Sequence, residues 1–217
     1  MRAAILDLPD SPSPENAAVS AAAECLLGGG VVAVPTETVY GLCATTGAPA
    51  SIAKLSDAKR RGGDTPFALL LPDARAAAEW GRVPEWAQPI LDALWPGPLT
   101  AVLPARTEAA TVLGSEGTIG IRVPDHDVPR AVAAALESRA GPGTALVATS
   151  ANRSGGVPLN CPDEIAAEFG EELDLILRCP GLPAGLASTV VDLCGHRPRV
   201  LRVGAVSERE LLSLARR

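Results

Sequence analysis

Apolar residues recur along this chain with two different periods, and these periods predict strands and helices in mixed order. Short apolar or alternating runs are typical of strands, and they stand at residues 5–10, 31–34, 67–72, 99–104, 118–124, 144–150, 173–178, 188–193 and 199–204. Longer segments with an apolar face at helical spacing predict helices at residues 14–27, 50–59, 83–95, 127–139, 161–170 and 207–217. Because the two kinds do not alternate strictly, we expect an α/β fold with a twisted, mixed parallel and antiparallel sheet and flanking helices.

Local signals mark where some of these helices begin and end. Ser13 is the expected N-cap of the first helix, with Pro14 at its first position and Gly28 as its C-terminal cap. Ser207 and Glu210 form a capping box for the last helix. The run Gly28 to Gly30 ends a helix instead of opening one, and no Gly-x-x-x-x-Gly-Lys-Ser/Thr motif follows, which excludes a phosphate loop of that type.

Composition supports one domain over residues 1–217 with a sizeable aliphatic core. Apolar residues make up 47% of the 217 residues and aromatic residues only 3%, so Ala, Val, Leu and Ile must fill the interior. The five cysteines are widely spaced without a Cys-x-x-Cys pair, which favours reduced thiols over a disulfide framework or a structural zinc site. No apolar run of about 18 residues and no signal-peptide pattern occurs, so we expect a cytoplasmic protein without a membrane partner.

The net charge of the chain bears on which molecules it could bind. The formal net charge is −6, which argues against broad, non-specific wrapping of nucleic acid, since that needs an extended basic surface. A local basic pocket remains compatible with this balance.

Hydrogen-bonding groups gather at the ends of predicted strands and in the loops beside them. Residues 35–42, PTETVYGL, follow the apolar run 31–34 and bring two threonines, a carboxylate and the single tyrosine of the chain. Comparable groups stand at 59–61, 118–122, 149–155, 188–189 and 202. Each set also has an ordinary structural explanation: a strand-terminal turn, a solvated helix end, a salt bridge or a solvent-facing arginine.

Together these groups share a chemical theme. Guanidinium groups grip carboxylate or phosphate through paired hydrogen bonds, and lysine supplies a point charge, so the set suits an anionic ligand. No activated nucleophile is visible: His126 and His196 are isolated and expected to be structural, and no cysteine has a recognisable general base. The set therefore predicts chemistry by positioning and charge stabilisation, as in nucleotidyl or phosphoryl transfer.

Seven segments carry a resemblance to a known family. They are PTETVYGL, KRR read as Lys-x-Arg, WPGPLT, TIGIRVPDH, TSANRSG, ASTVVDL and VLRVG. In this order they resemble the YrdC-like family, the threonylcarbamoyl-AMP synthases. The resemblance runs from about Val31 to Gly204, within a motif-bearing core of about residues 14–206.

The resemblance implies a YrdC-like fold with a concave basic pocket and a nucleotidyltransferase activity. The family makes threonylcarbamoyl-AMP from L-threonine, bicarbonate and ATP and releases pyrophosphate. Mg²⁺ is expected to arrive on the ATP phosphates, with no metal held by the protein itself. The product would feed threonylcarbamoyl modification of the adenosine beside the tRNA anticodon, through a tRNA-modifying transferase that receives it, with weak tRNA binding as a further expectation.

The resemblance also implies roles for individual residues. The residues expected to bind L-threonine are Thr38, Arg122 and Ser188. The residues expected to bind the ATP phosphates are Lys59 and Arg61, which are also the expected catalytic residues. The further ATP contacts are Thr65, Thr118, Ser150, Asn152 and Arg202. Glu37 and Tyr40 are expected to shape the pocket without a direct chemical role.

The chain departs from the family pattern at three places. Gly62 and Thr65 stand where the family usually has Pro and often Asn, GVPLN follows SANRSG where Ser-Pro-Thr is common, and LRVG replaces LRPG. The loop after Lys59 is therefore expected to be looser, with Thr65 a partial substitute. Two other functions stay open: an RNA-binding module without synthase activity, and a related carbamoyltransferase that forms a carbamoyl adenylate.

Overall fold

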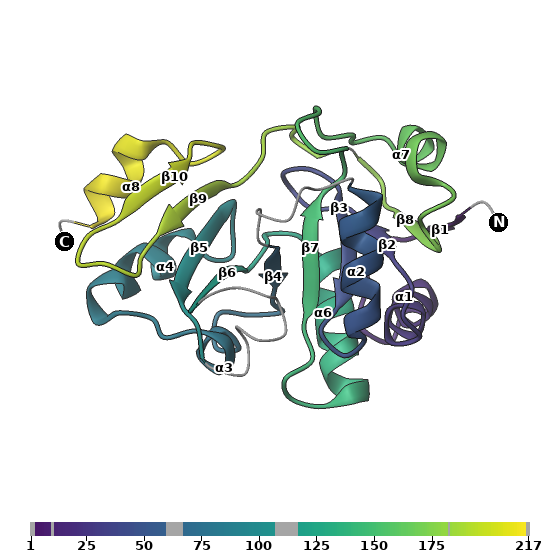
Figure 1. Cartoon of the computed structure of the whole chain (residues 1–217), viewed down its shortest axis with the longest axis horizontal. Coiled ribbons are helices and arrows are strands. Elements are labelled where there is room, and N and C mark those ends of the chain that lie inside the picture. The colour runs from purple at the N-terminus through teal and green to yellow at the C-terminus, as the bar shows by residue number, and fades with distance from the viewer. Residues whose placement is uncertain (1–2, 10, 60–66, 107–116, 182, 216–217) are drawn as a thin grey trace.

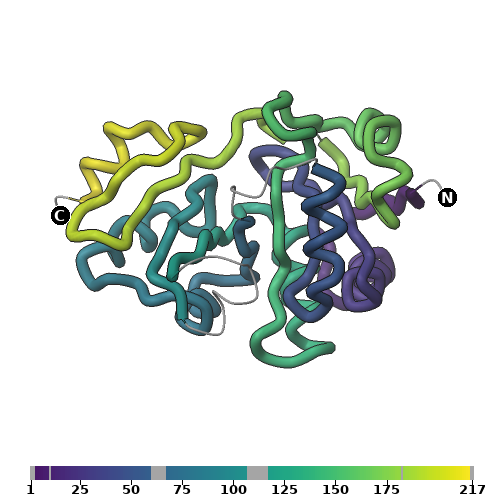
Figure 2. Tube along the Cα trace, viewed as in Figure 1, coloured from purple at the N-terminus to yellow at the C-terminus, as the bar shows by residue number. Residues whose placement is uncertain are grey.

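A single mixed sheet crosses the molecule in this computed structural model, which describes residues 3–9, 11–59, 67–106, 117–181 and 183–215 (Figure 1). In spatial order its strands are β1 (Ala4–Asp7), β8 (Leu175–Arg178), β2 (Val32–Val34), β3 (Gly41–Thr45), β7 (Leu146–Ser150), β4 (Ala68–Leu70), β6 (Thr118–Arg122), β5 (Leu99–Pro104), β9 (Thr189–Asp192) and β10 (Arg199–Arg202). The chain starts beside β1 and ends beyond β10, at opposite ends of the long axis (Figure 2).

Both strand directions occur in this sheet, as the sequence predicts. The pairs β1/β8, β2/β8, β4/β6 and β5/β9 are parallel. The pairs β2/β3, β3/β7, β4/β7, β5/β6 and β9/β10 are antiparallel. The expected fold class is therefore confirmed.

Helices cover both faces of the sheet and divide the core in two. The helices are α1 (Ala17–Leu27), α2 (Pro49–Ala58), α3 (Ala77–Trp80), the 3₁₀ turn η1 (Glu85–Ala87), α4 (Gln88–Leu94), α6 (Asp127–Ala140), α7 (Pro162–Phe169) and α8 (Glu208–Leu214). One core cluster joins α1 and α6 to sheet residues such as Val32 and Leu146. The other joins α2 and α7 to residues that point the opposite way, such as Leu42 and Val147, as the strand period of two requires. Figure 1 shows α2 in front of the sheet.

The start of the first helix differs from the prediction. The N-cap is Asn16, whose Oδ1 accepts from the backbone N–H of Ala18 at 2.9 Å and of Val19 at 3.5 Å. Asn16 N also donates to Ser13 O at 3.0 Å, so Ser13 opens a turn before the helix instead of capping it. Asparagine caps as well as serine does, so the sequence offered two comparable starts. Gly28 ends the helix and Ser207 caps α8, as predicted.

The segment 35–42 contains the connection between the antiparallel strands β2 and β3, and its last two residues begin β3, which the sequence pattern did not predict. Val34 pairs with Gly41, and residues 35–40 form the loop between them. Thr36 Oγ1 organises this loop by accepting from Thr38 N and Val39 N, each at 3.2 Å. The Tyr40 hydroxyl donates to the carbonyl of Leu177 at 3.1 Å, which anchors the loop to β8.

Two further observations concern the whole described chain. No helix among the described residues is long and apolar enough to cross a membrane. All five cysteines are free thiols, as predicted.

Candidate functional site

A pocket of about 320 Å³ lies over the central strands. Its floor contains a lateral row of small residues, because Ala68 of β4 pairs with Ala148 of β7 on one side and Gly120 of β6 on the other. Small side chains in register across three neighbouring strands leave room above the sheet. Glycine inside a strand is often found where a ligand approaches the backbone. These three residues are not among those predicted for the site from the motifs, although the Gly in TIGIR carries that signal.

Hydroxyl groups converge on this pocket from several elements. Thr100 Oγ1 and Ser188 Oγ lie 2.9 Å apart, and Thr36 Oγ1 and Thr38 Oγ1 are also 2.9 Å apart. The polar residues that line the pocket are Thr36, Tyr40, Thr100, Thr118, Arg122, Thr149, Ser150, Ser188 and Arg202. Five of the residues predicted for the site therefore meet in one hollow: Thr118, Arg122, Ser150, Ser188 and Arg202.

Three other predicted residues lie directly behind the pocket wall. Thr38 reaches it through Thr36. Lys59 is only 1% exposed, and its Nζ donates to Ser150 O at 2.6 Å and to Asn152 Oδ1 at 3.2 Å. Lys59 and Asn152 thus adjoin the pocket through Ser150. Arg61 and Thr65, and Gly62 in the same loop, lie outside the described residues.

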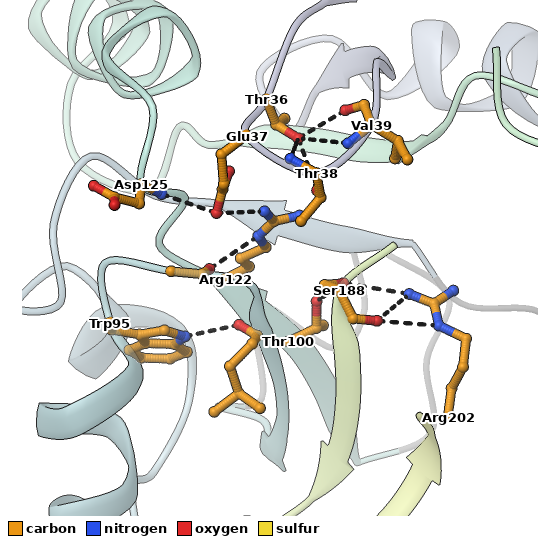
Figure 3. A network of polar contacts seen from close by, with 12 residues as sticks. Thr36, Glu37, Thr38, Val39, Trp95, Thr100, Arg122, Asp125, Ser188 and Arg202 are labelled. Atoms are coloured by element: carbon orange, nitrogen blue, oxygen red, sulfur yellow. Dashed lines mark hydrogen bonds and ion pairs between the residues drawn. The ribbon is translucent and has the colours of Figure 1, made fainter. Parts of the chain in front are cut away.

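Arg122, at the end of β6, is a buried cation that already has a carboxylate partner (Figure 3). Its Nη2 lies 2.7 Å from Glu37 Oε1, and its Nε donates to Gly97 O at 3.2 Å. Glu37 Oε1 also accepts from Asp125 N at 3.1 Å, which fixes the carboxylate. The 2.7 Å contact of Arg122 Nη2 is an ion pair without hydrogen-bond geometry, and Glu37 Oε2 is buried without a hydrogen-bond partner among the described residues. This pair is neutral overall and retains unused hydrogen-bonding capacity at the pocket.

Arg202, on β10, stands on the other side of Ser188 (Figure 3). Its Nε and Nη2 donate to Ser188 O at 3.3 and 2.9 Å, and Nη2 also donates to Ser188 Oγ at 3.3 Å. Within the described residues no carboxylate forms an ion pair with Arg202. Partial burial first, and then the charge of Arg122, lower the pKa of Arg202. An anion placed between the two guanidinium groups would relieve this repulsion.

A close backbone contact holds Arg202 beside Ser188. Thr189 Oγ1 accepts from Gly204 N at 2.9 Å and from Val206 N at 3.0 Å. A Cβ on Gly204 would overlap the carbonyl oxygen of Ala187 and lie 2.5 Å from the carbonyl carbon of Ser188. Only glycine fits at this position, which explains the physical need for the glycine in VLRVG. The motif VLRVG contains Gly204 without indicating this role, and no sequence signal identifies Thr189 as a support.

His126 has a structural role, as predicted. His126 caps α6, with Nδ1 accepting from Val128 N at 3.2 Å. The neutral ring therefore carries its proton on Nε2, which lies 3.8 Å from Cys179 Sγ. A nitrogen that already holds a proton cannot take one from the thiol, so this pair does not form a base and nucleophile.

Comparisons with known proteins identify a family and several relatives of this chain. The sequence model of the Sua5/YciO/YrdC family, described as "Telomere recombination", matches residues 24–204. A "Threonylcarbamoyl-AMP synthase" of Halorhodospira halophila is 40% identical over 169 residues, which cover 76% of this chain and 83% of that protein. The "Threonylcarbamoyl-AMP synthase" of Bacillus subtilis is 32% identical over 209 residues, or 95% of this chain.

A solved structure shows the same architecture. The structure titled "Crystal structure of P. abyssi Sua5 complexed with L-threonine" superimposes with a TM-score of 0.86 at 28% identity, over 97% of this chain. The matched regions make up 60% of the Pyrococcus abyssi protein and 59% of the Bacillus subtilis protein, so this chain spans about six tenths of their length.

Proposed function

The chain belongs to the Sua5/YciO/YrdC family, and we propose that it is a threonylcarbamoyl-AMP synthase. In this proposal it converts L-threonine, bicarbonate and ATP into threonylcarbamoyl-AMP, pyrophosphate and water. The single observation that carries the proposal is the pocket with Arg122 and Arg202 in its lining, surrounded by hydroxyl groups. Its volume of about 320 Å³ falls in the range of roughly 300–1,000 Å³ usual for small-molecule sites.

In the first step the threonine amine forms a carbamate. The nitrogen attacks carbon dioxide derived from bicarbonate, an N–C bond forms, and the displaced amine proton leaves with hydroxide as water. The residues assigned to bind the L-threonine substrate are Thr38, Arg122 and Ser188. Arg122 is matched by Glu37, so it orients the amino-acid carboxylate through directed N–H groups rather than through excess charge.

In the second step the carbamate oxygen attacks the α-phosphorus of ATP. A new P–O bond forms, the bond from the α-phosphorus to its bridging oxygen breaks, and pyrophosphate leaves. Both reactants are anions, and two like charges about 4 Å apart repel by about 4 kcal/mol at an effective dielectric constant near 20. Arg202 offers a cation without a carboxylate partner among the described residues, and Lys59 lies behind Ser150 at the same wall. We expect Arg61 and Thr65 to complete the phosphate contacts.

Magnesium enters this proposal as part of the nucleotide. No group of three or more His, Cys, Asp and Glu side chains in the described part of the chain could hold a metal ion. The pocket hydroxyls and arginines instead suit the phosphates that would carry Mg²⁺. When bound there, Mg²⁺ neutralises phosphate charge.

The product is a reactive mixed anhydride, so a second enzyme that accepts an acyl group must follow. We propose that this enzyme is a tRNA-modifying transferase that moves the threonylcarbamoyl group to the adenosine beside the anticodon. Weak contact of this chain with tRNA belongs to the same proposal.

Pyrophosphate release tests the proposed reaction. The protein is incubated with ATP and bicarbonate, and with L-threonine, L-valine, L-serine or no amino acid. We expect release that depends on threonine and is much weaker with valine, which has the same shape without the hydroxyl. Release that needs carbamoyl phosphate instead of threonine and bicarbonate would assign a carbamoyltransferase, and tight, salt-sensitive RNA binding without turnover would assign an RNA-binding module.

A further inference from the structure

The loop after β7 carries an arginine that does not line the pocket. Arg153 Nε contacts Glu168 Oε1 at 2.7 Å, and its Nη1 lies 2.9 Å from Glu172 Oε1. Its Nη2 donates to the carbonyl oxygen of Glu168 at 2.7 Å, and the guanidinium group lies 4.3 Å from the centre of the Phe169 ring. Two carboxylates already balance the charge of Arg153, so a direct role in phosphate binding is not its function.

The same side chain also reaches the end of α2. Arg153 Nη1 donates to the carbonyl of Ala58 at 2.5 Å, and the following residue, Ser154, donates its N–H to the carbonyl of Lys59 at 3.1 Å. The last carbonyls of a helix have no partner within the helix and need one from outside. Here the loop after β7 supplies both partners, so it fixes the backbone of Lys59.

The side chain of Lys59 is held by the other face of this loop. Asn152 Oδ1 accepts from Lys59 Nζ at 3.2 Å, while Asn152 Nδ2 donates to Arg153 O at 2.6 Å and to Gly156 O at 3.0 Å. The backbone and the ammonium group of Lys59 are therefore both bound to the short segment that contains Asn152 and Arg153. A shift of this segment against α2 would move the Lys59 ammonium relative to Ser150 at the pocket wall.

We propose that Arg153 is a positioning residue for the nucleotide side of the pocket. It joins α7, the end of α2 and the loop after β7, and so sets the place of the Lys59 ammonium group. Arginine suits this task because its planar fork donates in several directions at once, whereas lysine offers a single charged point. The expected effect on ATP rests on the proposed function, but the positioning of Lys59 does not.

Lysine labelling tests the positioning without any assumption about activity. The chain has only two lysines, the exposed Lys54 and the buried Lys59, which is 1% exposed. Reductive methylation followed by peptide mass spectrometry should modify Lys54 and spare Lys59 in the wild type. In Arg153→Met we expect the rate of Lys59 labelling to rise several-fold relative to Lys54. The matched control is Arg178→Met, which removes a partly exposed arginine paired with Asp7.

Steady-state kinetics of pyrophosphate release give the second readout. Loss of the charged hydrogen bonds of Arg153 should raise the KM for ATP about tenfold, equivalent to about 1.4 kcal/mol, with the KM for threonine within about twofold of wild type. Arg153→Lys should recover part of the loss, and Glu172→Gln, which removes one of the two carboxylates, should show a smaller change in the same direction. Arg178→Met should match the wild type.

The outcomes separate the two proposals. A wild type without threonine-dependent pyrophosphate release overturns the proposed function, while the labelling experiment still decides the role of Arg153. An Arg153→Met protein with Lys59 still protected and an unchanged KM for ATP overturns the positioning role, even if its melting temperature falls. The positioning role is supported if Lys59 labelling rises in both Arg153→Met and Glu172→Gln. Circular dichroism must show both variants folded to the wild-type extent.

Discussion

The two arginines of the pocket stand in opposite surroundings. Arg122 is buried and lies 2.7 Å from the carboxylate of Glu37, whereas the more exposed Arg202 directs its side-chain hydrogen bonds to the neutral Ser188 and forms no ion pair with a described residue. A cation with a carboxylate beside it contributes little net attraction for an anion, but its donors are held in fixed directions. A cation with neutral partners attracts an anion with most of its charge. We therefore propose that Arg122 orients a ligand and that Arg202 attracts its charge.

The supports of the two arginines differ in kind as well. Arg122 depends on an ion pair between β6 and the loop 35–40. Arg202 depends on the close approach of Gly204 to the backbone of Ser188 and on the hydroxyl of Thr189. Charge substitutions should therefore affect the first side, and steric substitutions the second.

The largest effect should come from breaking the steric support of Arg202. Gly204→Ala places a methyl group against backbone atoms of Ala187 and Ser188, which cannot move as a side chain would. We expect a loss of stability of about 1–3 kcal/mol from overpacking. We also expect at least a hundredfold loss in kcat/KM for ATP, because Arg202 and Ser188 both move. Thermal unfolding and the pyrophosphate assay measure the two effects.

Gly195→Ala is the matched control on the same hairpin, since a Cβ there would meet no atom within 4 Å. Its activity and melting temperature should equal those of the wild type. Equal behaviour of Gly204→Ala and Gly195→Ala would show that the close contact does not support Arg202.

Removing the charge of Arg202 alone should have the next largest effect. Arg202→Met keeps the length of the side chain and the backbone contacts of Gly204. A hydrogen bond to a charged group contributes about 1.5–3 kcal/mol, so the KM for ATP should rise about tenfold to hundredfold. The melting temperature should change little, because Arg202 is solvent-accessible. Arg199→Met is the control, because Arg199 lies on the same strand and pairs with Asp192 outside the pocket. An Arg202→Met variant with the wild-type KM would remove Arg202 from the site.

Neutralising Glu37 should lower the stability of the fold and strengthen the binding of threonine, which separates the two roles of this ion pair. Glu37→Gln leaves Arg122 buried without a charge partner, which should cost about 1–3 kcal/mol of stability. The released charge of Arg122 should lower the KM for threonine by about threefold. Glu79→Gln, an exposed carboxylate on α3 with no ion pair to a described residue, is the control. A higher KM for threonine in Glu37→Gln would mean that Glu37 serves mainly to place Arg122.

The smallest expected effect is a dependence of stability on pH, and it should arise only on the Arg122 side of the pocket. Burial lowers the pKa of His126, while the carboxylates of Glu37, Asp127 and Asp125 act in the opposite direction. As the pH falls, the histidine of the unfolded chain therefore takes up a proton near its usual pKa of about 6.5, before His126 of the folded protein does. The stability that the neutral His126 allows is present above about pH 6.5 and is lost as the pH falls toward the pKa of His126 in the folded protein.

His126→Asn retains a side chain that can cap α6 and removes the titrating group. Its melting temperature should fall less than that of the wild type between pH 7.5 and pH 5.5. His196→Asn, on the exposed turn after β9, should behave as the wild type does. An unchanged pH dependence in His126→Asn would exclude His126 as the source.

Much of this architecture follows from local sequence signals, and the remainder depends on contacts between distant segments. The strand and helix periods predicted most elements and the mixed fold. They missed β3, because GLCAT is short, wholly buried and without alternation. The helix start moved from Ser13 to Asn16 because two good caps stand three residues apart.

The site divides in the same way. Motifs named Thr118, Arg122, Ser150, Ser188 and Arg202, and all five line one pocket. No local pattern could show that Glu37 pairs with Arg122, that Arg153 holds the end of α2, or that Ala148, Ala68 and Gly120 align across three strands. These relations depend on strand order and register, which long-range pairing determines. The ligand roles of all the site residues stay predictions, and Arg61 and Thr65 also lie outside the described residues.

A crystal structure with L-threonine and a non-hydrolysable ATP analogue tests the division of roles most directly. We expect both ligands in the hollow above Ala68 and Gly120, with the amino-acid carboxylate on the donors of Arg122 and phosphate oxygens within hydrogen-bond distance of Arg202. Ligands bound elsewhere, or a triphosphate that contacts neither Arg202 nor the Ser150 wall, would contradict it.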